Sequence, residues 1–399
     1  MKVLIGAFGD PGHAFPAIAL GIALRDAGHD PTVETWQRWR VDVEREGLGF
    51  AAAPEYDVFP TQGRHLKPYE AVARAAVDTR TLVAQLRPDV VVADILTLAP
   101  ALAGELEGIP VATLIPHVDP RSAPGFPPYS MGARLPRWPG GRAAWSALAP
   151  FVQRGLEQGR DELNETRRRL GLPACAHVHN GISRQLSLVA TFPQLEYPRP
   201  PGSTPNAHVI GPLLWEPPTA DVDLDFGDLQ RPLVLVAPST AQDSEHRLLR
   251  VALAGLADLP VRVLATTNRR ALTGPAPTVG ANTRLVEWVS YARTMKHCDV
   301  VVTHAGHGTL VRALASGCAV VAVPAAGDMN ENAARVDWAG AGVRLPRRLC
   351  LPAAVRLAVG RTLERPALRA RARELQAWAA DSGGAAHAVA LLEDLAVSA

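Results

Sequence analysis

Residues 298–317 read CDVVVTHAGHGTLVRALASG, and this stretch carries the clearest local pattern in the chain. Its run of valines predicts a buried strand that ends at His304. Gly306 and Gly308 permit a tight turn into a helix that begins near Thr309. Such a turn presents backbone N–H groups at a helix N-terminus, which binds phosphate without needing a metal ion. The stretch therefore predicts an α/β domain with a phosphate site, to which the His304 imidazole adds a donor.

Strand and helix patterns alternate on both sides of this stretch. At the N-terminus an apolar strand at residues 3–7 leads into glycines and then a helix of apolar period, which Gly28 ends. Further strand patterns are PTVET, PDVVVAD and IPVATLI in the first half, and PLVLVAPST, PVRVLATT and CAVVAVP in the second. Such alternation predicts doubly wound, mostly parallel sheets of the α/β class.

The chain is long enough for two domains, since 399 residues exceed what one hydrophobic core usually supports. Proline crowds residues 193–232, which interrupts helices and central strands and predicts a linker. We predict a Rossmann-like first domain at 1–212, a linker at 213–232 and a second Rossmann-like domain at 233–378. A terminal helix at 379–399 is expected to pack back on the first domain. Ligands should bind between the domains, beyond the carboxyl ends of the strands.

Composition excludes several classes of function. The 41 basic and 39 acidic residues give a net charge of +2, so nucleic acid is not an expected partner. Apolar runs are interrupted before they could span a bilayer, and the N-terminus lacks the pattern of a secretory leader, so we expect a cytoplasmic protein. The cysteines, Cys175, Cys298, Cys318 and Cys350, show no paired short spacing. This argues against a zinc site or a disulfide framework.

Two residues at strand ends are candidates for acid–base chemistry. His13 follows the first strand, and Asp94 ends the buried strand VVVAD, where an unpaired carboxylate would be costly. Neighbouring strand ends can converge, and a carboxylate bonded to an imidazole would fix its tautomer and stabilise its protonated form. The alternative is that Asp94 caps the following helix.

A proline-rich stretch at residues 116–150 contains several aromatic residues and little periodicity. Such a loop could cover a hydrophobic acceptor, and Phe126, Tyr129 and Met131 are our candidates for acceptor binding. The alternative, that the loop only packs on its own domain, has equal weight.

Residues 287–342 resemble the donor-binding signature of the family 1 glycosyltransferases, in the branch that decorates bacterial polyketide and related antibiotics. The resemblance continues in the opening GDPGHAFPAIALGIALRDAGHD, in GPLLW, in VLVAPST and in the terminal SGGAAHAVALLEDL. Nearly the whole chain is covered, in the right order. The resemblance implies the GT-B fold, with the acceptor held by the first domain and the nucleotide sugar by the second.

The same resemblance implies a role for each matching residue in the donor site. Trp288 would stack on the nucleobase while the Val289 backbone bonds its edge, and Asp328 would accept hydrogen bonds from the sugar. The diphosphate contacts would be Ser239, Thr240, His304, Gly308 and Thr309, with Gly306 in the same turn.

The chain departs from the family pattern at two positions. Arg312 stands where the family commonly has a Glu for the ribose hydroxyls, which leaves ribose recognition open. Met329 follows Asp328 where many glucose-using members have Gln. A thioether is only a weak hydrogen-bond acceptor, so we expect a deoxysugar or aminosugar donor. The alternative is that Met329 points away and the donor is an ordinary hexose.

These features predict an inverting, metal-independent glycosyltransferase in which His13 is the general base and Asp94 orients it. The expected cosubstrates are a TDP- or UDP-sugar and a small natural-product aglycone, with no permanently bound cofactor and no membrane segment. A homodimer is left open.

Three rival functions are kept beside this one. Gly6, Gly9 and Gly12, followed some twenty residues later by Glu34, resemble a dinucleotide-binding motif, although the spacing between the glycines is wrong. An NAD-dependent oxidoreductase is therefore one rival. A sugar-nucleotide epimerase and a non-catalytic helper homologue are the others. The acidic run 221–225 has a metal-binding spacing, but its place in the linker favours a solvated loop.

Overall fold

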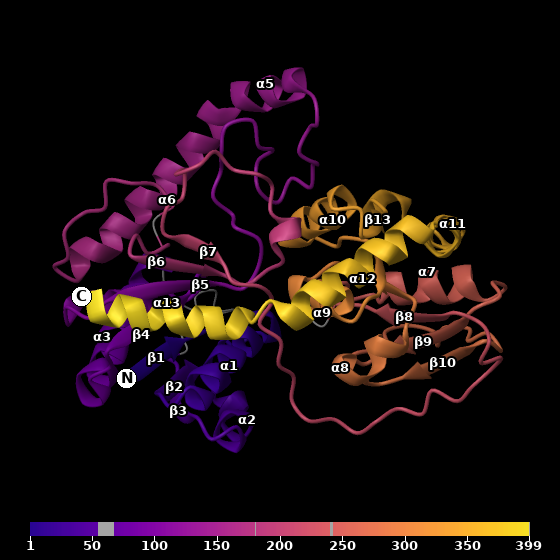
Figure 1. Ribbon diagram of the computed structural model, residues 1–399, viewed down its shortest axis with the longest axis horizontal. Coiled ribbons are helices and arrows are strands. Elements are labelled where there is room, and N and C mark those ends of the chain that lie inside the picture. The colour runs from indigo at the N-terminus through magenta and orange to yellow at the C-terminus, as the bar shows by residue number, and fades with distance from the viewer. Residues whose placement is uncertain (55–67, 180, 240–241, 399) are drawn as a thin grey trace.

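The computed structural model describes residues 1–54, 68–179, 181–239 and 242–398. Within these residues the chain forms two sheets, each flanked by helices, which lie side by side (Figure 1). Every strand pairing within either sheet is parallel, in the order β3-β2-β1-β4-β5-β6-β7 in the first and β10-β9-β8-β11-β12-β13 in the second. The predicted α/β class is confirmed.

The strands of the first sheet are β1 (Lys2–Gly6), β2 (Asp30–Thr35), β3 (Gly49–Ala52), β4 (Val90–Asp94), β5 (Val111–Ile115), β6 (Leu186–Val189) and β7 (Ala207–Val209). Those of the second sheet are β8 (Leu233–Ala237), β9 (Arg262–Thr266), β10 (Thr283–Val286), β11 (Val300–Thr303), β12 (Ala319–Ala322) and β13 (Gly342–Arg344).

The helices before the second sheet are α1 (Pro11–Asp26), α2 (Arg40–Arg45), α3 (Pro68–Leu86), α4 (Leu98–Leu106), α5 (Pro139–Ala147) and α6 (Ala149–Arg169). The later ones are α7 (Arg247–Leu256), α8 (Tyr291–Thr294), α9 (His307–Ala315), α10 (Asp328–Trp338), α11 (Pro352–Glu364), α12 (Pro366–Asp381) and α13 (Gly384–Ser398). Short 3₁₀ turns lie at η1 (Gln37–Trp39), η2 (Pro193–Leu195), η3 (Met295–His297) and η4 (Arg347–Leu349). Across the described residues, each helix is too short or too polar to cross a bilayer.

Each sheet has one point where the direction of strand progression reverses. In the first sheet β1 lies between β2 and β4, and in the second β8 lies between β9 and β11. The central strands β4 and β11 are fully buried, because helices cover both faces of each sheet. Ligands of doubly wound sheets bind beyond the carboxyl ends at such reversal points. We therefore expect a ligand site at the loops after β1, β4, β8 and β11.

The proline-rich stretch and the C-terminal helix both contribute to the first domain, although the helix follows the second domain in the sequence. Within residues 193–232, β7 joins the edge of the first sheet through β6, and the described chain forms no helix or strand from 210 to 232. At the far end, α13 returns to the first domain, where Ala388, Val389 and Leu392 enter its core beside α1 (Figure 1). Proline density alone does not mark the linker's start, because β7 is an edge strand that tolerates proline nearby.

Helix α10 of the second domain is held against the first domain by a buried arginine. Arg335, 2% exposed, donates to the carbonyl of Leu195 (3.1 Å) and to Glu196 (3.3 Å), and it also pairs with Glu331 at 2.7 Å. Its guanidinium lies over the Tyr197 ring, 3.6 Å from the centre. Because Arg335 is buried and bonds to groups of both domains, α10 has a defined position relative to the first domain.

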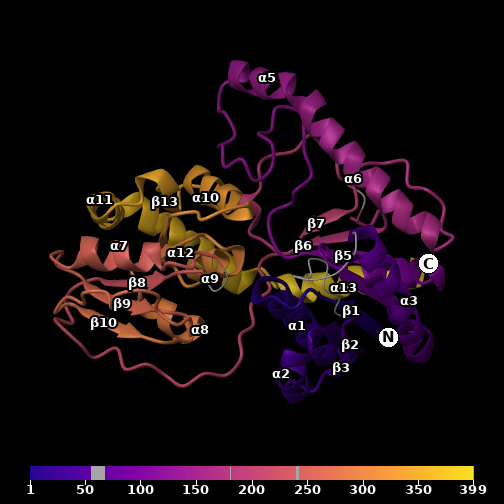
Figure 2. The same ribbon diagram turned by 180° about the vertical axis from the view of Figure 1, so that it is seen from behind.

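The loop of residues 116–138 also contacts α10. A Cβ added at Gly132, whose φ is +73°, would lie 2.8 Å from the Cβ of Asn330, so only glycine fits there. Arg134 pairs with Asp337 at 3.1 Å, and Arg344 donates to the Gly132 carbonyl. The loop therefore bridges the domains instead of packing only on its own. Helices α5 and α6 follow it and form an arm that leans away from the sheet (Figure 2).

Glu34, on β2, provides a prediction about stability. Its carboxyl is 2% exposed and accepts a hydrogen bond from Thr79 Oγ1 at 2.8 Å. Burial raises the pKa of Glu34 from 4.5 to about 7. The folded chain thus holds a proton that the unfolded chain releases near pH 4.5, and this stabilisation is lost as the pH rises through 7.

We expect Glu34→Gln to flatten part of this pH dependence. Between pH 5 and pH 8 the free energy of unfolding of the wild type should fall by roughly 2 kcal/mol relative to the variant. Urea unfolding at the two pH values measures both. A variant that follows the wild type in parallel would show that Glu34 is ionised in the folded state.

Candidate active site

A cleft between the two domains contains most of the predicted site residues. It encloses a cavity of about 300 Å³ and is lined by both domains and by the segment that joins them. The predicted site residues in its lining are His13, Ser239, Trp288, His304, Gly306, Gly308, Thr309, Arg312, Asp328 and Met329.

His13 and Asp94 meet at the reversal point of the first sheet. β1 and β4 are paired with Gly6 opposite Ala93, so the turn after β1 and the last residue of β4 lie together. His13 Nδ1 is 2.8 Å from Asp94 Oδ1, and Asp94 Oδ2 accepts from the Phe8 amide at 3.3 Å. The Asp94 side chain is fully buried, whereas that of His13 is 16% exposed and faces the cleft.

This geometry sets the tautomer of His13. A carboxylate oxygen accepts the Nδ1 hydrogen, which leaves the lone pair of neutral His13 on Nε2. Burial alone would lower the pKa of His13, but the hydrogen bond and the charge of Asp94 outweigh it and raise this pKa above 6.5. Asp10 and Asp328 add to the rise. The imidazole is thus suited to take up a proton at Nε2.

His117 is a cleft residue that the sequence analysis missed. It lies just after β5, and its ring centre is 6.4 Å from that of His13. Its Nδ1 donates to the Val118 carbonyl at 2.8 Å, so Nε2 is the acceptor. Burial lowers the pKa of His117, which keeps the ring neutral. The rule that ligands bind at strand ends would have found it, because Pro116 and His117 follow the strand VATLI.

The N-terminus of α9 opens into the second-domain side of the cleft. Helix α9 begins at His307, two residues before the predicted start, because Gly306 and Gly308 both keep negative φ and Gly308 fits the first turn. Among the described residues, a Cβ added at either glycine would meet no atom within 4 Å apart from its chain neighbours and the backbone of α9. Neither glycine is therefore required by packing, and the space beside them is free for a ligand to approach the backbone N–H groups.

His304 has different partners from those that the sequence predicts. Its Nδ1 accepts from the Ser239 amide at 2.9 Å, so Nε2 carries the hydrogen, and Nε2 lies 3.3 Å from Asp243 Oδ2. Burial raises the pKa of Asp243, but the hydrogen bond from His304 and those from backbone amides outweigh it and hold this pKa well below its usual range. With both nitrogens engaged, His304 fixes the loop after β8 to the end of β11 and is not a free donor.

Trp288 and Arg312 belong to the second domain and line the cleft. The Trp288 indole donates to Thr219 Oγ1 at 3.2 Å, and the Arg269 guanidinium lies 4.7 Å from its ring centre. The Val289 side chain is buried in the core. Arg312, on α9, donates to the Trp215 carbonyl at 2.8 Å.

Asp328 and Met329 begin α10 and line the cleft. Asp328 Oδ2 accepts from Asn332 Nδ2 at 3.3 Å, and Asp328 is close enough to His13 to influence its pKa. The Arg335 contacts described above therefore fix these two residues relative to the first domain.

The three predicted acceptor residues occupy different surroundings. The Tyr129 hydroxyl is 3.4 Å from His117 Nδ1, which connects it to the cleft. Phe126 packs edge-on against Tyr197, with ring centres 5.6 Å apart, and Met131 is 53% exposed. None of the three is among the residues that line the cleft cavity. Thr240, predicted to contact diphosphate, lies outside the described residues.

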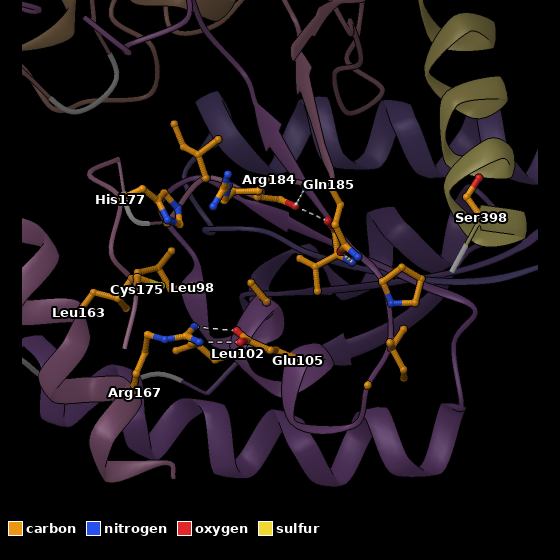
Figure 3. Close-up of a pocket in the computed structure, with 18 residues that line it drawn as sticks. Leu98, Leu102, Glu105, Leu163, Arg167, Cys175, His177, Arg184, Gln185 and Ser398 are labelled. Atoms are coloured by element: carbon orange, nitrogen blue, oxygen red, sulfur yellow. Dashed lines mark hydrogen bonds and ion pairs between the residues drawn. The ribbon is translucent and has the colours of Figure 1, made fainter. Parts of the chain in front are cut away.

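A larger cavity, of about 680 Å³, lies elsewhere in the first domain (Figure 3). It is lined by residues that precede β5 and β6, at the amino ends of the strands, where ligands of such sheets do not usually bind. Its buried Arg167 forms a two-pronged ion pair with Glu105, with distances of 2.6 and 2.7 Å. Within the described residues of its lining, no histidine is hydrogen-bonded to a carboxylate as His13 is to Asp94, so the cleft is the candidate active site.

The structure also bears on two signals of the rival functions. Glu34 is buried against Thr79 and is not in the cleft, so it is not placed to bind a ribose hydroxyl there. In the acidic run, Asp221 pairs with Arg293 at 2.7 Å and Asp223 with Arg284 at 3.0 Å. Within the described residues these carboxylates act as ion-pair partners at the surface.

Two parallel α/β domains that enclose a cleft between their strand ends form the architecture of the GT-B fold. Solved structures of that class superpose on the whole chain. The glycotransferase of kitacinnamycin has a TM-score of 0.74 at 20% identity, over 99% of this chain and 98% of its own. Glycosyltransferase VinC in complex with DTDP has a TM-score of 0.73 at 19% identity and covers 100% of both chains.

Sequence comparisons agree with the fold. Residues 250–395 match the family described as "Erythromycin biosynthesis protein CIII-like, C-terminal domain". Over the full length, 4'-demethylrebeccamycin synthase from Lentzea aerocolonigenes is 29% identical and is matched over 99% of each chain. The chain is therefore a glycosyltransferase homologue, and the resemblance that the sequence analysis identified is confirmed.

Proposed function

We propose that this protein is an inverting, metal-independent glycosyltransferase that transfers a deoxysugar or related sugar from a nucleoside diphosphate to a hydroxyl of a small natural-product aglycone. The observation that carries the proposal is the His13–Asp94 hydrogen bond at the cleft, which leaves the lone pair of neutral His13 on Nε2. Opposite this pair, the N-terminus of α9 opens into the same cleft. A base and an anion site that face each other are what glycosyl transfer to a hydroxyl requires.

The proposed reaction follows from these two features. His13 Nε2 takes the proton of the acceptor hydroxyl while that oxygen bonds to the anomeric carbon of the sugar. The bond from this carbon to the diphosphate breaks on the opposite side, so the configuration inverts through an oxocarbenium-like transition state. Asp94 stabilises the imidazolium that forms, and the backbone N–H groups at Gly306 and Gly308 meet the charge of the leaving diphosphate.

The choice of sugar rests on the start of α10. Asp328 can accept hydrogen bonds from sugar hydroxyls, whereas the Met329 thioether presents an apolar surface to the cleft. A buried polar group left without a partner costs about 1–3 kcal/mol, so a hydroxyl next to Met329 is disfavoured. A thymidine-diphosphate sugar is the donor we propose first, since VinC, which shares the fold, is described with DTDP.

The experiment is a transfer assay read by mass, with UDP-glucose and TDP-deoxysugars offered to hydroxylated aromatic and macrolide acceptors. We expect product from a TDP-deoxysugar with turnover at least about tenfold above that from UDP-glucose, as one unpaired hydroxyl implies. A chelator should leave the rate unchanged.

Other outcomes would contradict the proposal in distinct ways. Donor consumed without acceptor would favour an epimerase, and nucleotide binding without turnover would favour a helper homologue. A preference for UDP-glucose that is undiminished in Met329→Ala would refute the donor assignment alone.

A further inference from the structure

Glu216 is a carboxylate in the cleft that the sequence analysis did not single out. It belongs to the segment between the two domains, and its side chain is 17% exposed. Oε1 accepts hydrogen bonds from Ser290 Oγ and from the Ala292 amide, the latter at 3.1 Å. Oε2 lies 3.8 Å from Arg312 Nε, beyond hydrogen-bond distance, and it has no hydrogen bond within the described part of the chain.

The contacts of Glu216 locate it between two parts of the proposed donor site. Ser290 and Ala292 come directly after Trp288, the proposed platform for the nucleobase. Arg312 lies one helical turn after Thr309 on α9, whose N-terminus faces the proposed diphosphate position. In a nucleoside diphosphate the pentose separates the base from the diphosphate. The carboxylate of Glu216 therefore lies beside the position that the pentose of a bound donor would occupy.

The chemistry of the neighbouring side chains supports this position. A pentose hydroxyl can donate a hydrogen bond, and an ionised carboxylate is an acceptor with a free lone pair, whereas Arg312 offers only donors. Asp10 and Asp328 are the other carboxylates among the described residues of the lining, and they lie at the starts of α1 and α10. Glu216 is thus the carboxylate beside Trp288.

We propose that Glu216 Oε2 accepts a hydrogen bond from a pentose hydroxyl of the donor nucleotide, while Arg312, Ser290 and Ala292 hold the carboxylate in place. This inference rests on the proposed function, because it assumes that a nucleoside diphosphate occupies the cleft. It assigns nucleotide specificity to a residue of the interdomain segment. Arg312 then serves the pentose through Glu216 instead of contacting it as an acceptor.

The test compares uridine diphosphate with its 2'-deoxy and 3'-deoxy forms by titration calorimetry on the whole protein. In the wild type, removal of the 3'-hydroxyl, which thymidine diphosphate also carries, should weaken binding about 10- to 100-fold, as expected for a hydrogen bond to a charged group. In Glu216→Ala the three ligands should bind within about twofold of each other.

Two further variants keep the result interpretable. Glu216→Gln retains an oxygen for Ser290 and Ala292 but directs an amide donor at the hydroxyl, so it should also lose the preference. Glu287→Ala removes an exposed carboxylate beside Trp288 that does not line the cleft, and it should keep the wild-type preference. Equal affinity of the wild type for all three ligands would overturn the inference, as would equal weakening of all three in both Glu216 variants. A wild-type protein that binds neither uridine diphosphate nor thymidine diphosphate would instead contradict the proposed function.

Discussion

Replacement of His13 by alanine is expected to lower kcat by about 10²- to 10⁴-fold, which is the usual worth of a general base. The Kd for nucleoside diphosphate should change by less than about twofold, because His13 lies on α1 of the first domain and the proposed diphosphate site is on α9 of the second. Single-turnover kinetics with a saturating donor measure the first quantity, and calorimetry measures the second.

A matched control is His297→Ala, which removes an exposed histidine at the end of η3 and should leave both quantities unchanged. If His13→Ala reduced nucleotide affinity as much as turnover, His13 would belong to the donor site and the assignment of the base would fail.

Replacement of Asp94 by asparagine is expected to lower kcat by about 10²- to 10⁴-fold, since an amide stabilises an imidazolium poorly and allows the wrong tautomer. It should also change the pH dependence of kcat/KM. In the wild type this ratio should rise with pH through an apparent pKa above 6.5, because only neutral His13 accepts a proton and Asp94 raises its pKa. Without the carboxylate charge, burial dominates and the inflection should move to lower pH.

This variant also separates the catalytic role from a structural one. Asp94 accepts a hydrogen bond from the Phe8 amide, so thermal unfolding must show that Asp94→Asn is folded. Wild-type turnover with an unshifted pH profile would reduce Asp94 to a hydrogen-bond partner of the Phe8 amide.

Residue placement at the two reversal points explains why the proposed base and the proposed anion site lie on opposite sides of the cleft. His13 follows β1 and Asp94 ends β4, while Ser239 follows β8 and His304 follows β11. In each domain the loops from the two central strands are joined by a hydrogen bond to a histidine. In the first domain that histidine keeps a free nitrogen toward the cleft. In the second domain both nitrogens of the histidine are engaged, so the backbone N–H groups of α9 are the groups that we propose bind the diphosphate.

Local patterns in the sequence were sufficient to predict the α/β class, the reversal-point residues His13 and Asp94, and the succession of a strand, a turn and a helix at β11 and α9. They suffice because strand and helix periods are read over a few neighbouring residues, and because parallel strands bring their carboxyl ends to one edge. The identities at positions 312 and 329 were equally visible, and the prediction of a deoxysugar or aminosugar donor rests on Met329.

Only the tertiary structure decided which side chains face the cleft and which pack against other parts of the protein. The partners of His304 at Asp243, the inward position of Glu216 beside Arg312, the packing of Phe126 on Tyr197, and the attachment of α10 through Arg335 all join residues far apart in the chain. Such contacts depend on how loops and domains pack, and a hydrogen bond takes its partner from whatever group lies within about 3 Å. The periods and spacings of the sequence do not show which distant groups come within hydrogen-bond distance of each other.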